Sequence, residues 1–284
     1  MLRTISDPLN NNGTINNHSE LNLENSFYSD SSAFISDSGS VVKLTGGGQH
    51  IPGMHYANLF IDSESGDYHP VELQGNAYVS ESIVINEMCT VQLLEGNELE
   101  LGPDATLTES DEAGLSGDGR VFTTRELSSP FIMNIGGIGG GIFSPANLGT
   151  TTINRWNQPI VSENGAGINK VIEFLPENNE ELGATMIFHY REEAELGNNH
   201  SENNLMLFSS SNGGETWWWE EDAILNTSDN TLTLYNVASL YRYTASENNL
   251  ETQFPPVALD DEAEMFEDTG SIIISVLDND SDVN

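Results

Sequence analysis

The stretch that decides the fold is VELQGNAYVSESIVINEMCTVQLLEGNELELGPDATL, residues 71–107. It consists of short runs in which apolar and polar residues alternate, and Gly, Asn, Pro and Asp separate the runs. Alternation with a period of two is the pattern of a β-strand with one buried face. The runs recur about every six to eight residues, so that three of them make a repeat of roughly 20 residues, which is typical of a solenoid.

A right-handed parallel β-helix is the fold that this repeat favours. One coil cannot bury its inward side chains, but stacked coils bring Val, Ile and Leu into a continuous column. The same pattern of short β-type runs, without a helical period, extends from about Asn11 to Thr124. We therefore predict a β-helix-like solenoid over residues 1–127. Irregular spacing around residues 46–48 and 63–68 leaves a β-sandwich of short strands as the alternative.

A different sequence pattern, with longer β-type runs, follows Arg125. Residues 131–152 are rich in Gly, and longer alternating runs come after them, including residues 184–190 and 231–235. Long alternating strands separated by turns are typical of an antiparallel β-sandwich. We predict such a module over residues 128–252.

The remaining residues, 253–284, begin a third region. From Pro255 they read PPVALDDEAEMFEDTGSIIISVLDNDSDVN. The two prolines and the acidic composition predict a linker followed by the start of an Ig-like or cadherin-like module. The sequence ends before that module could bury a core, so we expect this chain to be a fragment of a longer protein.

Charge and hydropathy narrow the possible partners. The 45 Asp and Glu residues against 8 Lys and Arg give a net charge of −37, which repels nucleic acid and anionic lipid. Hydrophobic residues make up 37%, enough to bury real cores. The longest apolar run, residues 272–277, is too short to span a bilayer, and residues 1–10 lack the apolar core of a signal peptide. We expect no membrane span, and any secretion signal would precede this segment.

Cysteine and histidine usage argues against a zinc or disulfide-stabilised site. Cys89 is the single cysteine and lies in an apolar stretch, so a buried hydrophobic role is expected for it. The histidines lack the spacing of zinc ligands. They are His18, His50, His55, His69, His189 and His200.

Acidic residues in the tail predict a calcium site. Asp278, Asp280 and Asp282 alternate, so that in a strand their carboxylates would share one face and require a counter-ion. Calcium binds oxygen ligands of this kind. We predict a structural Ca²⁺ at the joint with the following module, and a solvated acidic linker is the alternative. The proposed ligands are Asp260, Asp261, Glu267, Asp278, Asn279, Asp280 and Asp282.

Three consecutive tryptophans suggest a carbohydrate platform. They follow the segment SSNGGET, residues 210–216, which resembles the Asp-box hairpin of sialidases, with Asn212 where Asp is usual. That hairpin is a turn device rather than a catalytic site. Alternation places Trp217 and Trp219 on one face and Trp218 on the other. At least one face should be core, and the other is a candidate surface for stacking on sugars.

Three stretches resemble parts of secreted Bacteroidetes multi-module surface adhesins. Residues 11–127, with HYANLFID and GDGRVFTTREL, resemble their β-helical stalks. Residues 131–244, with IGGIGGGIFSPANLGTTTINRW and NNLMLFSSSNGGETW, resemble the β-sandwich module that follows such stalks. The tail resembles bacterial Ig-like and cadherin-like repeats, because PVALDD, EDT and VLDNDSD keep their order and spacing.

This resemblance covers nearly the whole chain and implies a function. A secreted or cell-surface fragment would mediate attachment or spacing without catalysis, with a surface glycan or another cell-surface protein as partner. The alternative is a β-helix module that binds or degrades a polysaccharide. A groove with converging carboxylates and aromatic side chains would favour the enzyme, whereas an evenly polar solenoid surface would favour the stalk.

Overall fold

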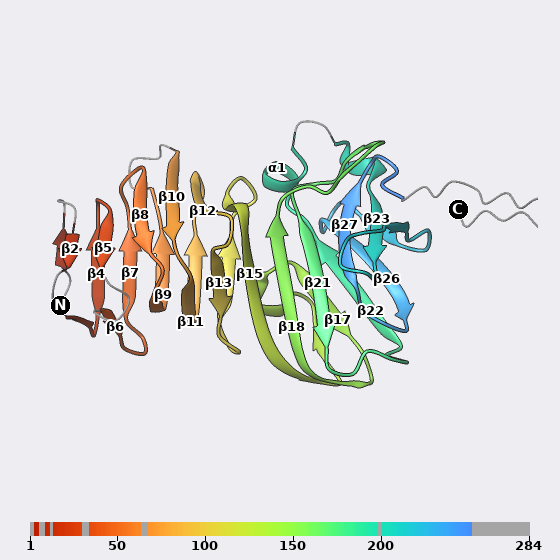
Figure 1. The fold of residues 1–284 in the computed structure, drawn as a ribbon, viewed down its shortest axis with the longest axis horizontal. Helices are drawn as coiled ribbons and strands as arrows, with labels where there is room; N and C mark the ends of the chain where they lie inside the picture. The colour runs from red at the N-terminus through yellow and green to blue at the C-terminus, as the bar shows by residue number, and fades with distance from the viewer. Residues whose placement is uncertain are drawn as a thin grey trace, which may run out of the picture.

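The computed structural model describes residues 3–5, 9–11, 14–29, 34–63, 68–197 and 200–251, and the side chains from Thr14 onward except Ser29. These residues are organised almost entirely as β-strands (Figure 1), so the predicted all-β class is confirmed. The tail with its predicted calcium ligands lies outside the described residues.

The N-terminal half is a solenoid of about five turns, as predicted. Its main face is a parallel sheet whose neighbours are successive coils, and a second parallel sheet covers another face. Parallel pairing between coils rules out the short-strand sandwich for this part, and the right hand of the solenoid stays a prediction. The main sheet contains β1 (Arg3–Ile5), β4 (Glu20–Leu23), β7 (Val41–Leu44), β9 (His55–Ile61), β11 (Ala77–Ile85), β13 (Glu98–Leu101) and β15 (Gly114–Ser128).

The other solenoid strands complete the coils. The second sheet contains β8 (Gln49–Pro52), β10 (His69–Gln74), β12 (Cys89–Leu93) and the first residues of β15. β14 (Thr106–Glu109) pairs with the end of β11. The first coils add the pairs β2 (Leu9–Asn11) with β5 (Phe27–Ser29) and β3 (Ile15–Asn17) with β6 (Phe34–Ser36).

Stacked aliphatic side chains fill the solenoid, as the alternating runs predict. Ile83 in β11 is in register with Leu59 of the previous coil and Leu107 of the next, and all three are buried. Polar side chains form ladders between the same coils: Ser82 Oγ donates to Asn58 Oδ1 at 2.6 Å, across 24 residues. Cys89 is fully buried in this column, and burial raises the pKa of its thiol to about 11. The expected hydrophobic role of Cys89 is thus confirmed.

The second half continues the main sheet with antiparallel strands. β15 pairs with parallel β13 on one side and with antiparallel β18 on the other, so the predicted boundary between residues 127 and 128 falls inside one strand. A second, five-stranded antiparallel sheet lies beyond (Figure 1). The classification of this half as a β-sandwich stays a prediction. The main sheet adds β18 (Asn147–Asn157), β21 (Val171–Pro176), β27 (Arg242–Ser246), β23 (Met206–Ser210) and β24 (Trp218–Trp219).

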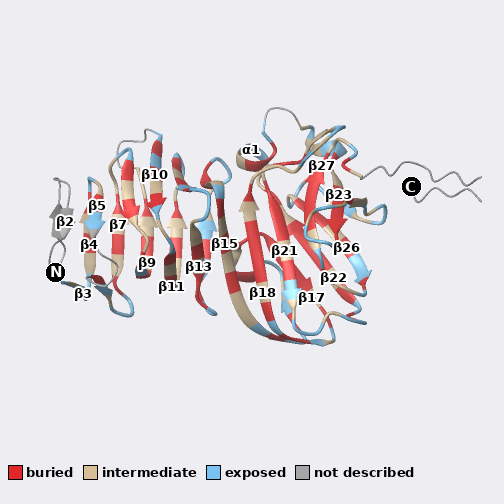
Figure 2. Cartoon of the chain, viewed as in Figure 1, coloured by how far each residue is buried: buried red, intermediate tan, exposed pale blue. Residues whose placement is uncertain are grey.

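The five-stranded sheet and short elements complete the described chain. Buried residues of this sheet and of the main sheet belong to the same apolar cluster that fills the solenoid, so the core passes through both halves without a gap (Figure 2). The sheet contains β16 (Phe131–Ile132), β17 (Gly140–Phe143), β22 (Ala184–His189), β26 (Thr231–Val237) and β25 (Ile224–Asn226). The short elements are the hairpin β19 (Val161–Ser162) and β20 (Gly165–Ala166), the helix α1 (Glu192–Glu195) and the 3₁₀ turns η2 (Ile135–Gly137) and η3 (Glu202–Asn204).

A ladder of hydrogen bonds crosses the outer face of the main sheet where the two halves meet. Arg120 in β15 donates to Glu98 in β13 and to Asn154 in β18. Asn154 Nδ2 donates to Glu173 in β21 at 2.9 Å, and Arg242 in β27 donates to the other oxygen of that carboxylate at 2.8 Å. Five successive strands, one from the solenoid and three beyond β15, are thereby connected by side chains as well as by backbone pairing.

Candidate functional site

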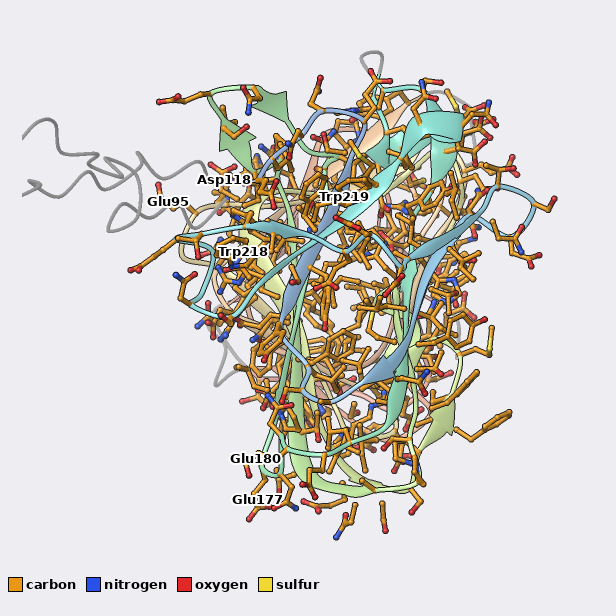
Figure 3. All side chains as sticks on the ribbon, turned by 90° about the vertical axis from the view of Figure 1, so that its right-hand side faces the viewer. Glu95, Asp118, Glu177, Glu180, Trp218 and Trp219 are labelled. Carbon is orange, nitrogen blue, oxygen red and sulfur yellow. The ribbon has the colours of Figure 1, made fainter. Side chains whose placement is uncertain are left out.

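The predicted calcium ligands cannot be placed, because all seven lie in the tail. In the part of the chain that the structure describes, no group of three or more His, Cys, Asp or Glu side chains is arranged to hold a metal ion. Several surface carboxylates, including Glu95, Asp118, Glu177 and Glu180, lie on the periphery of the molecule (Figure 3). The calcium site therefore stays a prediction about the tail.

The tryptophan segment does not follow the predicted alternation, because Trp217 lies before the two-residue strand β24 and differs from Trp219 in exposure. Trp217 is 3% exposed and packs in a small apolar cluster with Phe208, whereas Trp219, opposite Phe208 across β23 and β24, is 43% exposed. Trp218 is half-buried (Figure 3). Trp217 is therefore core. The carbohydrate platform stays a prediction, and Trp218 and Trp219 are the two that retain surface for it.

The hairpin before Trp217 has the turn role expected for it. Asn212 Oδ1 accepts hydrogen bonds from Ser210 Oγ at 2.9 Å and from the backbone N–H of Thr216 at 3.0 Å. The indole N–H of Trp217 donates to the carbonyl of Gly214 at 3.1 Å. These bonds close the turn internally, so the Asn side chain serves the hairpin here.

A buried charged cluster lies where the last solenoid coil meets the antiparallel strands. None of the sequence patterns described above predicts it. Its five side chains come from four places in the fold, and each is 11% exposed or less. They are Glu109 at the end of β14, Arg155 in β18, Lys170 just before β21, and Arg191 and Glu195 at the two ends of α1.

Glu195 is the centre of this cluster. Its carboxylate accepts from Lys170 Nζ at 2.9 and 3.0 Å, from Arg155 Nη2 at 3.1 Å and from Arg191 Nε at 2.9 Å. The backbone N–H of Arg191 also donates to it at 3.0 Å. Three cations therefore share one carboxylate, which fixes α1 against both β18 and the start of β21.

Glu109 connects the same cations to the solenoid. It accepts from the guanidinium of Arg155 and from the backbone N–H of Leu115 at 2.7 Å, and forms an ion pair with Arg191 at 3.2 Å. Arg191 Nη1 also donates to the carbonyls of Ser110 and Ala113, which belong to the last coil. The cluster thus ties the end of the solenoid to elements of the second half.

Charge balance determines the protonation of the cluster. Burial alone would raise the pKa of Glu195, but Lys170, Arg191 and Arg155 lower it to about 2. Burial lowers the pKa of Lys170 to about 8; Glu195 opposes this shift, and repulsion from Arg155 and Arg191 adds to it. The physical reason is that three cations surround two carboxylates, so the amine is the group that gives up a proton first.

Two adjoining cavities open beside the cluster. One, of about 310 Å³, is lined by residues of both halves, among them Asn134, Lys170 and His189. The other, of about 540 Å³, runs along the solenoid past Asp62 and Asn86. Thr108 and Glu109 line both cavities, and the larger one alone crosses three successive coils, from Asp62 past Asn86 to Glu109.

Gly139 leaves space for the Lys170 amine beside the 310 Å³ cavity. It has a φ of +99°, and a Cβ built on it would lie 2.5 Å from both Cε and Nζ of Lys170. Any side chain at this position would therefore displace the amine, and positive φ itself disfavours one. Within the Gly-rich run of residues 136–141, Gly139 is the residue that accommodates Lys170.

A signal for the cluster is present in the sequence. Ile153 and Arg155 are two residues apart in β18 and both are fully buried, so the arginine occupies a core-facing position of a strand. A cation at such a position requires buried partners. The pattern cannot identify those partners, which lie 40 and 46 residues away in the sequence.

Replacing Lys170 with Met tests the protonation of the cluster. Between its folded pKa of about 8 and the ordinary value of 10.5, the unfolded chain binds more protons at this lysine than the folded chain does. The contribution of Lys170 to the free energy of unfolding therefore rises with pH across that window, by roughly 3 kcal/mol at most. The difference in unfolding free energy, wild type minus Lys170→Met, should be flat below about pH 8 and rise above it. Urea unfolding of both proteins measures this difference, and a flat difference up to pH 10.5 would show that Lys170 titrates normally.

No helix in the described residues has the length and apolar character to cross a membrane. No protein-family model, no curated protein and no solved structure matches this chain.

Proposed function

We propose that the chain is a non-catalytic fragment of a secreted or cell-surface adhesin, in which solenoid and antiparallel strands form one stiff spacer. The observation that carries this proposal is the continuous main sheet, which runs from β1 through β15 to β24 without an interruption at the joint. Bending at the joint would break backbone pairs between β15 and β18, the outer ladder and the buried cluster together. A joint with three such connections favours transmission of force over hinge motion.

The surface of the solenoid supports a structural role. Among its described residues the cations are paired or in contact with neighbours, as with Lys43 and Asp62 at 3.3 Å. The 540 Å³ cavity is lined by no aromatic side chain. Of its three lining carboxylates, Asp62 is paired with Lys43 and Glu109 with two arginines, and Glu87 is the third. The net charge of −37 would keep neighbouring spacers apart. A calcium ion at the tail residues 260–282 would stiffen the joint with the next module.

Stiffness at the joint is measurable with a pair of spin labels. Tyr28 and Ile224 are exposed and lie in the solenoid and in β25, so Tyr28→Cys with Ile224→Cys, in a Cys89→Ala background, reports the distance across the joint. We expect a single narrow distance distribution by pulsed electron paramagnetic resonance. The control pair Tyr28→Cys with Leu94→Cys lies within the solenoid. A distribution across the joint much broader than that of the control would contradict a stiff spacer.

A polysaccharide-binding module is the second candidate, because the 540 Å³ cavity crosses three successive coils of the solenoid. Binding to a glycan array, with calcium and with chelator, separates it from a passive spacer when released reducing ends are measured in the same wells. Retention without cleavage would give an adhesin with a glycan-binding surface. Turnover of any glycan would contradict the non-catalytic proposal.

A further inference from the structure

The charged cluster at the joint has one positive charge more than it has carboxylates. Two arginines and Lys170 face Glu109 and Glu195 only. The other cations of the described side chains have carboxylate neighbours of their own: Lys43 with Asp62, Arg120 with Glu98, Arg125 near Asp104, and Arg242 with Glu173. In a chain with a net charge of −37, a buried positive excess beside a cavity is a site that favours an anion.

Two hydrogen-bond donors at the cavity remain available. Both bonds of Lys170 Nζ go to Glu195, and among the described residues no third acceptor contacts the amine. Asn134 Oδ1 accepts from the backbone N–H of Gly139 at 2.7 Å, and no described residue accepts from its Nδ2. Both residues line the 310 Å³ cavity. An ammonium and an amide donor at one cavity can bind the two oxygens of a carboxylate.

The volume of the 310 Å³ cavity and its other lining residues restrict the size and charge of the ligand. The volume of about 310 Å³ is that of a small-molecule site. Thr108 and His189 offer polar groups suited to hydroxyls, while Asp111 places a negative charge in the lining. Glu109 in the lining is already paired with arginines, and the exposed carboxylate of Asp111 offsets the excess cation. A ligand with a single negative charge is therefore favoured over sulfate or phosphate, which carry more charge. A hydroxylated monocarboxylate of one sugar ring has these properties.

We propose that this cavity binds the carboxylate of a uronic acid, with Lys170 and Asn134 donating to its oxygens. The site goes beyond the spacer function and does not depend on it. It would hold an acidic sugar at the joint, where residues of the solenoid and of the second half both contribute to the lining.

Isothermal titration calorimetry with sodium glucuronate tests the proposal on the full chain, at constant ionic strength. Wild type should bind glucuronate with a Kd of about 1 mM or below and should not bind glucose, which lacks the carboxylate. Lys170→Met leaves two cations with two carboxylates and should weaken glucuronate at least about ten-fold. Its thermal unfolding curve confirms that the cluster still folds.

A second variant keeps the proposal falsifiable if Lys170→Met does not fold. Asp111 is exposed, and Asp111→Asn removes the opposing charge, so it should tighten glucuronate binding about three-fold, and less at high salt. Equal binding of glucose and glucuronate, or equal affinity in wild type and both variants, would overturn the proposal. Tighter binding of sulfate or inorganic phosphate would overturn the assignment to a carboxylate. Absence of any heat with wild type and with Asp111→Asn would overturn the site itself.

Discussion

Replacing Glu195 with Gln is expected to lower the free energy of unfolding by about 3–5 kcal/mol, although the two side chains have nearly the same shape. Glu195 accepts hydrogen bonds from Lys170, Arg155 and Arg191, and without its charge only Glu109 remains opposite three buried cations. The loss is bounded because Lys170 can release its proton, since its pKa is already lowered to about 8. Urea unfolding near neutral pH measures the change.

Lys170→Met is the matched control at the same centre. It removes a cation instead of an anion and leaves two arginines facing two carboxylates. The free energy of unfolding should therefore fall far less than with Glu195→Gln. In the double variant the loss caused by Glu195→Gln should shrink, which a double-mutant cycle would register as a coupling of about 1–3 kcal/mol. A cost below about 1 kcal/mol for Glu195→Gln, as for a surface ion pair, would show that the cluster is hydrated and not buried.

Replacing Ile83 with Ala is expected to cost about 2–5 kcal/mol, because the side chain is fully buried between Leu59 and Leu107 of the neighbouring coils. Few side chains in the column can move to fill the space, since the backbone ladder fixes the distance between coils. In a solenoid each coil is stabilised by its neighbours, so the defect weakens the coils on both sides. Chemical denaturation followed by circular dichroism measures the loss.

Val84→Ala provides the comparison, because Val84 is the next residue of β11 and points to the opposite, half-exposed face. It should cost about 1 kcal/mol or less. Similar losses for the two variants would contradict the inward column. Hydrogen exchange of the coils containing β9 and β14 would localise the weakening of Ile83→Ala, and protection unchanged in those coils would contradict the coupling between neighbours.

The solenoid could be predicted from residues 71–107 because every coil repeats the same pattern of short alternating strands separated by turns. Each alternating run fixes which side chains face inward, and the spacing between runs fixes which coil lies beside the next. The continuity at β15 could not be predicted in this way. Burial alternates in β15 from Gly119 to Thr123, where the strand pairs with β13 and β18, and nothing in that pattern distinguishes a parallel neighbour from an antiparallel one.

The buried charged cluster and the exposure of the tryptophans were less predictable from the sequence than the solenoid. Arg155 at a core-facing position is the one local sign of a buried cluster, but its partners come from β14 and α1, far along the chain. Alternation places Trp217 and Trp219 on the same face, whereas Trp217 precedes β24 and packs with Phe208 and Trp219 is exposed. Pairings between distant residues leave little trace in a single sequence.

The way the solenoid is joined to its neighbour also has a bearing on how such a chain can evolve. Backbone pairing joins each described inner coil only to the coils before and after it, whereas the ladder and the charged cluster involve the last coil alone. Duplication or loss of an inner coil would therefore change the reach of the protein by one strand spacing and leave the connection to the second half intact. Natural variants of different reach would be expected to differ by whole coils well before β13, and to keep the residues of the joint unchanged.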